Sequence, residues 1–148
     1  MLSMKNVIAF LRGGTSSFNE PELLLLHATL DSLPKEEAEI LAKQIEAVSL
    51  IQRQHPGRLV VAYYPKRSNV PQLAYLGYEY CISKVTYKSA GKRKTTNLVL
   101  HDGRFMTFER NVPLRNEKIE SIVQVVPHPG GYKPVAEEID TEEHGANA

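Results

Sequence analysis

The residues best suited to acid–base or metal chemistry are five histidines, and their spacing builds no local site. They are His27, His55, His101, His128 and His144. None forms an HxH or HExxH pair, and a single cysteine, Cys81, excludes a CxxC metal motif. His101 and Asp102 are adjacent, but neighbours at a hairpin corner point apart, and the Asp-Gly turn already accounts for Asp102. We therefore predict no catalytic, metal-binding or cofactor-binding residue and no cofactor.

Glycine-rich segments that hold phosphates in other proteins also lack the required context here. Gly13 to Ser17 contains two glycines, but the chain has no GxxxxGK[ST] and no GxGxxG motif. No helix is expected after Gly130-Gly131 whose N-terminus would bind a phosphate. A small enzyme whose site assembles from distant residues, such as His101, Tyr64 and Glu109, stays open as an alternative, because catalytic groups often meet only in the fold.

Charge is distributed unevenly along the chain, although the formal net charge is only +1. Residues 20–52 carry seven acids against two bases, whereas residues 58–94 carry eight bases against one acid. Residues 134–148 contain five acids and no base. This polarity bears on the partners of the protein and not on its fold.

The basic stretch is the most informative feature for function. Lys84, Thr86 and Lys88 are spaced two residues apart, so a strand places them on one sheet face, which the Lys92-Arg93-Lys94 tip extends. The predicted binding surface consists of Lys66, Arg67, Lys84, Lys88, Lys92, Arg93 and Lys94.

Three interpretations of this surface remain open. Tyrosines nearby in the sequence suit nucleic acid, because bases stack on aromatic rings while phosphates pair with cations. A lysine-rich, solvated face that resists edge-to-edge aggregation is the structural alternative. Finally, the acidic C-terminal tail, or the acidic helices of a second copy, would be electrostatically suited to cover this face.

Hydrophobic spacing predicts that the first third of the chain is helical. Gly13 supplies a stop for the first helix, for which a strand over residues 7–11 is the competing alternative. Asn19 caps the second helix, with Pro21 in its first turn, and Pro56 ends the third. The three predicted helices cover about residues 2–12, 20–31 and 34–53.

After Gly57 the pattern changes to β-branched and aromatic runs bounded by turn residues, which predicts strands. Asp102-Gly103 is the strongest hairpin signal. Strands joined by short turns must be antiparallel, because parallel neighbours need long crossovers. We therefore expect an α+β fold, with N-terminal helices packed on a meandering antiparallel sheet of about five strands over residues 58–127. The expected core contains Leu41, Ile45, Val48, Val61, Val99 and Phe108.

The 148 residues fit a single α+β domain over residues 1–140, followed by an acidic tail, 141–148, that we expect to be disordered. The apolar run Val7–Leu11 is too short for a secretory signal, and no stretch approaches the roughly 20 apolar residues of a membrane span. Cys81 is interpreted as a buried apolar side chain, with a reactive thiol as the alternative. These features predict a cytoplasmic protein without membrane contact.

The sequence commits the chain to no reaction. We expect a non-enzymatic binding or regulatory protein that engages another macromolecule, of the adaptor or toxin-neutralising kind, through its sheet face or its leucine-rich helix. A protein partner is favoured, nucleic acid is the first alternative, and a homo-oligomer is a further one. The alternatives predict different surfaces, because exposed tyrosines beside a positive face favour nucleic acid and a deep polar pocket favours an enzyme.

Overall fold

A computed structural model describes residues 3–54, 58–66, 68–74, 78–110 and 118–130. Within these residues, three helices come first: α1 (Met4–Leu11), α2 (Glu20–Ser32) and α3 (Lys35–Ala47). The strands are β1 (Leu50–Gln54), β2 (Leu59–Tyr63), β3 (Glu79–Ser89), β4 (Lys92–His101), β5 (Arg104–Arg110) and β6 (Ser121–Pro127). They pair antiparallel in one sheet of order β1-β2-β5-β4-β3-β6. The α+β fold is thus confirmed, with slightly more strands than expected.

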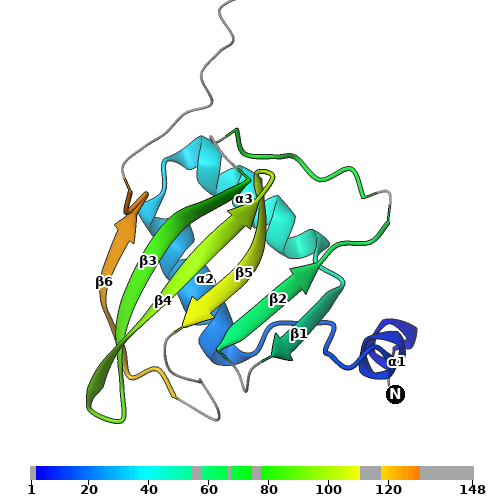
Figure 1. Cartoon of the computed structure of the whole chain (residues 1–148), viewed down its shortest axis with the longest axis horizontal. Helices are drawn as coiled ribbons and strands as arrows, with labels where there is room; N and C mark the ends of the chain where they lie inside the picture. The colour runs from blue at the N-terminus through cyan, green and yellow to red at the C-terminus, as the bar shows by residue number, and fades with distance from the viewer. Residues whose placement is uncertain (1–2, 55–57, 67, 75–77, 111–117, 131–148) are drawn as a thin grey trace, which may run out of the picture.

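The sheet has helices on one side only. β3, β4 and β5 form a meander through two tight turns, whereas β2 and β3 are separated in the sheet by β5 and β4. Figure 1 shows α2 and α3 side by side across one face of the sheet, with the opposite face free of helices. Antiparallel sheets commonly bury one face and leave the other in contact with solvent. The exposed face is therefore the place to look for a binding surface.

The third helix is shorter than its hydrophobic spacing predicts. The helix expected over residues 34–53 ends at Ala47, and Leu50–Gln54 forms the edge strand β1 instead. All five residues of β1 pair in register with β2. Periodicity cannot distinguish a short apolar run in a strand from one in a helix, so the tertiary pairing with β2 decides the outcome.

The first helix forms as predicted but does not bury its apolar stripe. The Ser3 side chain caps α1, and Gly13 follows it with φ of 75°. Met4 and Leu11 are 73% and 77% exposed, and Ala9 is the buried residue of the helix. Figure 1 shows α1 standing apart from the other helices, beside β1. Its amphipathic spacing therefore predicts the helix correctly without predicting its burial.

The predicted start of α2 is confirmed and is tied to the sheet. Asn19 and Glu22 form a capping box, in which each side chain accepts a hydrogen bond from the backbone N–H of the other. Glu22 is 2% exposed and also receives two hydrogen bonds from Arg53 of β1, at 2.9 and 2.7 Å. A buried carboxylate needs such compensation, because an isolated buried charge is costly.

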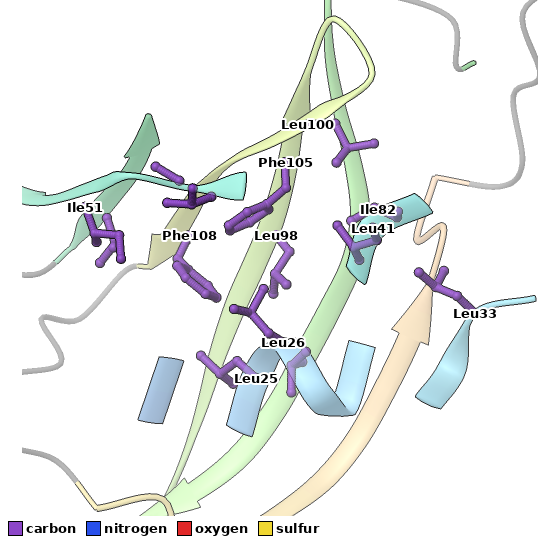
Figure 2. Close-up of a cluster of buried hydrophobic side chains, with 14 of the residues drawn as sticks. Leu25, Leu26, Leu33, Leu41, Ile51, Ile82, Leu98, Leu100, Phe105 and Phe108 are labelled. Atoms are coloured by element: carbon purple, nitrogen blue, oxygen red, sulfur yellow. The ribbon is translucent and has the colours of Figure 1, made fainter. Parts of the chain in front are cut away.

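The core lies between the helices and the covered face of the sheet. Figure 2 shows Leu25 and Leu26 of α2 near the strand residues Leu98 and Phe108, and Leu41 of α3 beside Ile82. Of the expected core residues, Leu41, Val48 and Phe108 belong to the buried cluster, and Ile45 packs against it.

Two expected core residues lie on the other face of the sheet. Val61 and Val99 are buried but pair with Thr107, whereas their neighbours Val60 and Leu98 pair with Phe108 of the core. Successive residues of a strand alternate between faces, so the prediction placed these two buried valines on the wrong face of the sheet.

No helix in the described ranges is long and apolar enough to span a membrane. The predicted tail, 141–148, and the boundary at residue 140 lie outside the described residues.

Candidate functional site

Three cations of the predicted binding surface share the helix-free face of the β3–β4 hairpin. Lys88 stands opposite Arg93, and Lys84 lies on the same face four residues before Lys88. Between Lys84 and Lys88, Thr86 stands opposite Thr95, and their hydroxyl oxygens lie 3.4 Å apart. All three cations are exposed. We call Lys84, Lys88 and Arg93 the basic hairpin face.

The other predicted cations are placed elsewhere. Lys92 and Lys94 alternate with Arg93 and therefore point to the opposite side of the hairpin. Lys66 follows β2 and lines a pocket beside the β4–β5 turn, at the opposite end of the sheet. Arg67 lies outside the described residues. The fold thus distributes the described cations of the basic stretch among three places: the two sides of the β3–β4 hairpin and the pocket.

Acidic groups limit the extent of the basic hairpin face. Glu109 on β5 follows Asn97 on β4 in the row of residues that begins with Lys84. At the hairpin tip, the Glu120 carboxylate accepts a hydrogen bond of 3.2 Å from the backbone N–H of Gly91. The positive patch therefore covers one hairpin and not the whole face of the sheet.

Cys81 lies on the same sheet face, nearer the other end of β3. Its thiol donates a hydrogen bond to the Ser83 carbonyl oxygen at 3.4 Å. Burial raises the pKa of the Cys81 thiol, and the nearby charges of Glu109 and Lys84 act in opposite directions. A raised pKa suppresses the nucleophilic thiolate, so this environment supports the interpretation of Cys81 as a structural residue.

The tyrosines of β3 do not accompany the cations on their face. Tyr80 and Tyr87 are 9% and 1% exposed and belong to the core cluster on the helix side. Tyr78 is 66% exposed, but it lies at the far end of β3, in contact with His101. The alternation of strand residues explains this separation, because Tyr87 and Lys88 must point to opposite faces.

Of the three residues considered for an enzyme site, the fold brings two together. Tyr64 and His101 both line the pocket beside the β4–β5 turn, while Glu109 lies on the sheet face beyond Asn97. The Tyr64 hydroxyl donates to the Phe105 carbonyl oxygen at 2.5 Å, and burial raises its pKa well above the ordinary value. A committed hydroxyl with a raised pKa is poorly suited to act as a general base at neutral pH.

A hydrogen-bonded chain through His128 gave no recognisable signal in the sequence. His128 Nε2 lies 3.0 Å from a Glu37 carboxylate oxygen, and Nδ1 lies 2.6 Å from the Tyr80 hydroxyl. The three residues come from α3, the end of β6 and β3, and no local spacing connects them. His128 thus joins the helix layer to the sheet, which gives it a structural role.

In the described part of the chain, no three His, Cys, Asp or Glu side chains gather closely enough to hold a metal ion. Comparisons of the chain with protein-family models, with curated proteins and with solved structures found no match. The interpretation of function therefore depends on the chemistry of the two regions just described, the basic hairpin face and the pocket at the β4–β5 turn.

Proposed function

We propose that this chain is a non-enzymatic binding protein that engages an acidic surface of another protein through the basic hairpin face. One observation supports the proposal most strongly. Lys84, Lys88 and Arg93 are exposed together on a face that no helix covers, and none of them forms a salt bridge with another described residue. A patch of like charge steers and orients a partner of opposite charge.

A protein partner is favoured over nucleic acid because of the tyrosines. Single-stranded nucleic acids are usually held by aromatic rings that stack on bases as well as by cations that contact phosphates. Here Tyr80 and Tyr87 are buried on the helix side, away from the cations. The face offers charges and threonine hydroxyls, which suit carboxylates presented by a folded protein.

The leucine-rich helix is less suited to a partner than the hairpin. Leu25 and Leu26 of α2 are 0% and 1% exposed and are already used in the core, which leaves only Leu23 and Leu24, 38% and 39% exposed, on its outer side. The proposed function is that of an adaptor, regulator or toxin-neutralising protein that acts in the cytoplasm. A second copy of the chain is a competing partner, because α3 carries the exposed acidic residues Glu36 and Glu39.

Affinity capture with matched charge variants tests the proposal. The face variant carries Lys84→Gln, Lys88→Gln and Arg93→Gln, and the control carries Lys35→Gln, Lys43→Gln and Arg58→Gln. The control residues are equally exposed and lie outside the hairpin, so both variants lose three positive charges. We expect the parent and the control to retain a partner protein after nuclease treatment and the face variant to lose it. Equal capture by all three proteins would contradict the proposal.

Two further measurements distinguish the competing partners. Fluorescence anisotropy with random single- and double-stranded oligonucleotides at two salt concentrations reports on nucleic acid. If phosphates are the target, the face variant should reduce the salt slope by about two to three units. Sedimentation of the parent alone reports on self-association, which the face variant would abolish if a second copy covers the hairpin.

A further inference from the structure

A second region with the chemistry of a binding site lies at the other end of the sheet, where β2 ends and β4 turns into β5. A pocket of about 460 Å³ opens there, which lies within the usual range for small-molecule sites. Its wall includes Tyr63 and Tyr64 at the end of β2, Tyr78 before β3, and His101 and Arg104 on the two sides of the β4–β5 turn. We call it the end pocket.

The frame of the end pocket is held by hydrogen bonds of a buried side chain, Gln44. Gln44 of α3 is 0% exposed, and its amide nitrogen donates to the carbonyl oxygens of Pro71 and Gly103 at 2.8 and 2.9 Å. Its side-chain oxygen accepts a bond of 2.9 Å from the backbone N–H of Phe105. Leu73 N–H also donates to Gly103 at 2.8 Å. A preformed frame lowers the entropic cost of binding a ligand.

Three residues that line the end pocket each carry a buried polar atom without a hydrogen-bond partner. These atoms are the Ser68 hydroxyl oxygen, His101 Nδ1 and Arg104 Nε. More than about 90% of buried polar groups in folded proteins have a partner, so three such atoms around one pocket are unusual. Because they lie in its wall, a polar ligand in the pocket can supply their partners after small side-chain rotations.

The charges of the end pocket favour an anion. Arg104 and Lys66 both line it, and neither forms a salt bridge with a described residue. Asp102 is an exposed acid of the lining, at the turn. A Glu79 carboxylate oxygen lies 3.6 Å from His101 Nε2, but Glu79 itself is not part of the lining. The local balance of cations over acids therefore suits a carboxylate or a phosphate, both of which arginine binds well.

The remaining surface of the end pocket favours a planar ring. Tyr63, Tyr64 and Tyr78 provide aromatic surface, and Met106 adds an apolar, polarizable side chain. The Arg104 guanidinium carbon already lies 6.0 Å from the centre of the Tyr64 ring. A ligand ring would pack on this aromatic surface while its acidic group reaches the cations.

We propose that the end pocket binds a small organic anion with a planar ring, whose carboxylate or phosphate group lies at Arg104 and Lys66. This site is independent of the basic hairpin face, because it lies at the opposite end of the sheet and uses other residues. Its ligand would be a ring-bearing carboxylate or a nucleotide-like phosphate, and the two sources are distinguished by experiment.

Paired charged and neutral probes test the end pocket on the full chain. The pairs are salicylate with salicylamide and adenosine monophosphate with adenosine, each titrated by calorimetry and by amide chemical shifts of the labelled protein. We expect one of the anions to shift the resonances of Ser68, His101 and Arg104 and to bind at least about tenfold more tightly than its neutral partner. Binding of salicylate alone indicates a carboxylate ligand, and binding of the nucleotide alone indicates a phosphate ligand.

Charge variants locate the binding. Arg104→Gln and Lys66→Gln should each lower the affinity for the anion by about tenfold. The matched control Arg93→Gln, on the hairpin face, should leave that affinity unchanged. Lys66 is exposed, so its substitution should not disturb the fold. Lys66→Gln therefore still tests the proposal if Arg104→Gln perturbs folding. The proposal is overturned if neither anion shifts the pocket resonances at millimolar concentration, if neutral and charged probes bind equally, or if Arg93→Gln is as harmful as Lys66→Gln.

Discussion

The two turns that join β3, β4 and β5 share a backbone conformation but differ in their surroundings. At the hairpin tip, Ala90 and Gly91 have φ values of 51° and 71°, and at the end pocket Asp102 and Gly103 have values of 49° and 73°. Both pairs suit the two-residue turns that match the twist of antiparallel strands. Gly91 has open space around its Cα, whereas a Cβ added at Gly103 would overlap the Leu73 carbonyl oxygen.

This difference separates local from tertiary requirements. The tip needs only residues that accept positive φ, so its neighbours are free to carry charge for a partner. The turn at the end pocket has a second role, because Gly103 accepts bonds from Gln44 and Leu73 and so fixes the loop that walls the pocket. The same type of turn thus forms a free tip at Ala90-Gly91 and anchors a loop at Asp102-Gly103.

The largest expected effect comes from valine at the two glycines. Gly103→Val should lower the free energy of unfolding by about 3–5 kcal/mol, because backbone strain at positive φ adds to the overlap with Leu73. Gly91→Val should cost about 1–2 kcal/mol, from the backbone strain alone. Chemical denaturation of both variants measures the difference. Equal losses would show that the contact with Leu73 contributes nothing and would remove the distinction between the turns.

A smaller loss of stability is expected when the side chains that hold the end pocket and the hairpin tip in place are substituted. Gln44→Leu removes three hydrogen bonds and leaves the buried N–H of Phe105 without a partner, so it should cost about 2–4 kcal/mol. Its counterpart near the tip is Ser89, which is 1% exposed and donates a single bond to the Lys118 carbonyl oxygen at 3.0 Å. Ser89→Ala should cost about 1 kcal/mol.

Urea unfolding curves would rank these two variants. If Gln44→Leu proved no more harmful than Ser89→Ala, the loop at the end pocket would not depend on Gln44, and the view of that end as a preformed frame would fail.

Alkaline pH should act through the end pocket. Burial raises the pKa of Tyr64 above its ordinary value of 10.0, although the charge of Arg104 opposes the shift. The folded protein therefore holds this proton more tightly than the unfolded chain, and the resulting stability is complete below pH 10.0 and is lost as pH rises through the folded pKa. Thermal unfolding between neutral pH and pH 11 should show this loss, about 11 being the practical upper limit below arginine titration.

Two variants separate the contributions of Tyr64 and Cys81 to the loss of stability at alkaline pH. Tyr64→Phe should make the decline with pH shallower, although it removes the bond to Phe105 at every pH. The raised pKa of Cys81 contributes in the same direction from its ordinary value of 9.0 upward, so Cys81→Ala should flatten the earlier part of the curve. A Tyr64→Phe curve parallel to that of the parent would refute the role of Tyr64.

Much of the architecture was predictable from local patterns in the sequence. The capping residue Asn19 and the Asp102-Gly103 turn were both identified from residue types, because each follows from chemistry within four residues. The extent of α3 and the faces of Val61 and Val99 were not, because they depend on strand pairing between distant segments. Local preference specifies elements better than it specifies their partners.

The sites differ in the same way. The alternation of Lys84 and Lys88 was sufficient to place both on one face, which Arg93 joins through the strand register. The end pocket was not predictable, because Ser68 and Arg104 come from separate segments that only the completed fold brings together. Tyr64 and His101 were singled out for an enzyme site, and the sequence held no signal that they share a pocket.

The smallest expected effect on stability comes from the charges at the tip. Replacing Lys92, Arg93 and Lys94 together with alanine should change the free energy of unfolding by no more than about 0.5 kcal/mol, as exposed surface substitutions usually do. Arg93 belongs to the basic hairpin face, so the same variant should slow association with an acidic partner. Denaturation and association kinetics on one preparation measure both effects. A loss of several kcal/mol would mean that the tip is held by its charges, as the end pocket is held by Gln44, and the contrast between the ends would disappear. Unchanged stability with slower association would instead assign the tip charges to recognition, because they would then contribute to binding and not to folding.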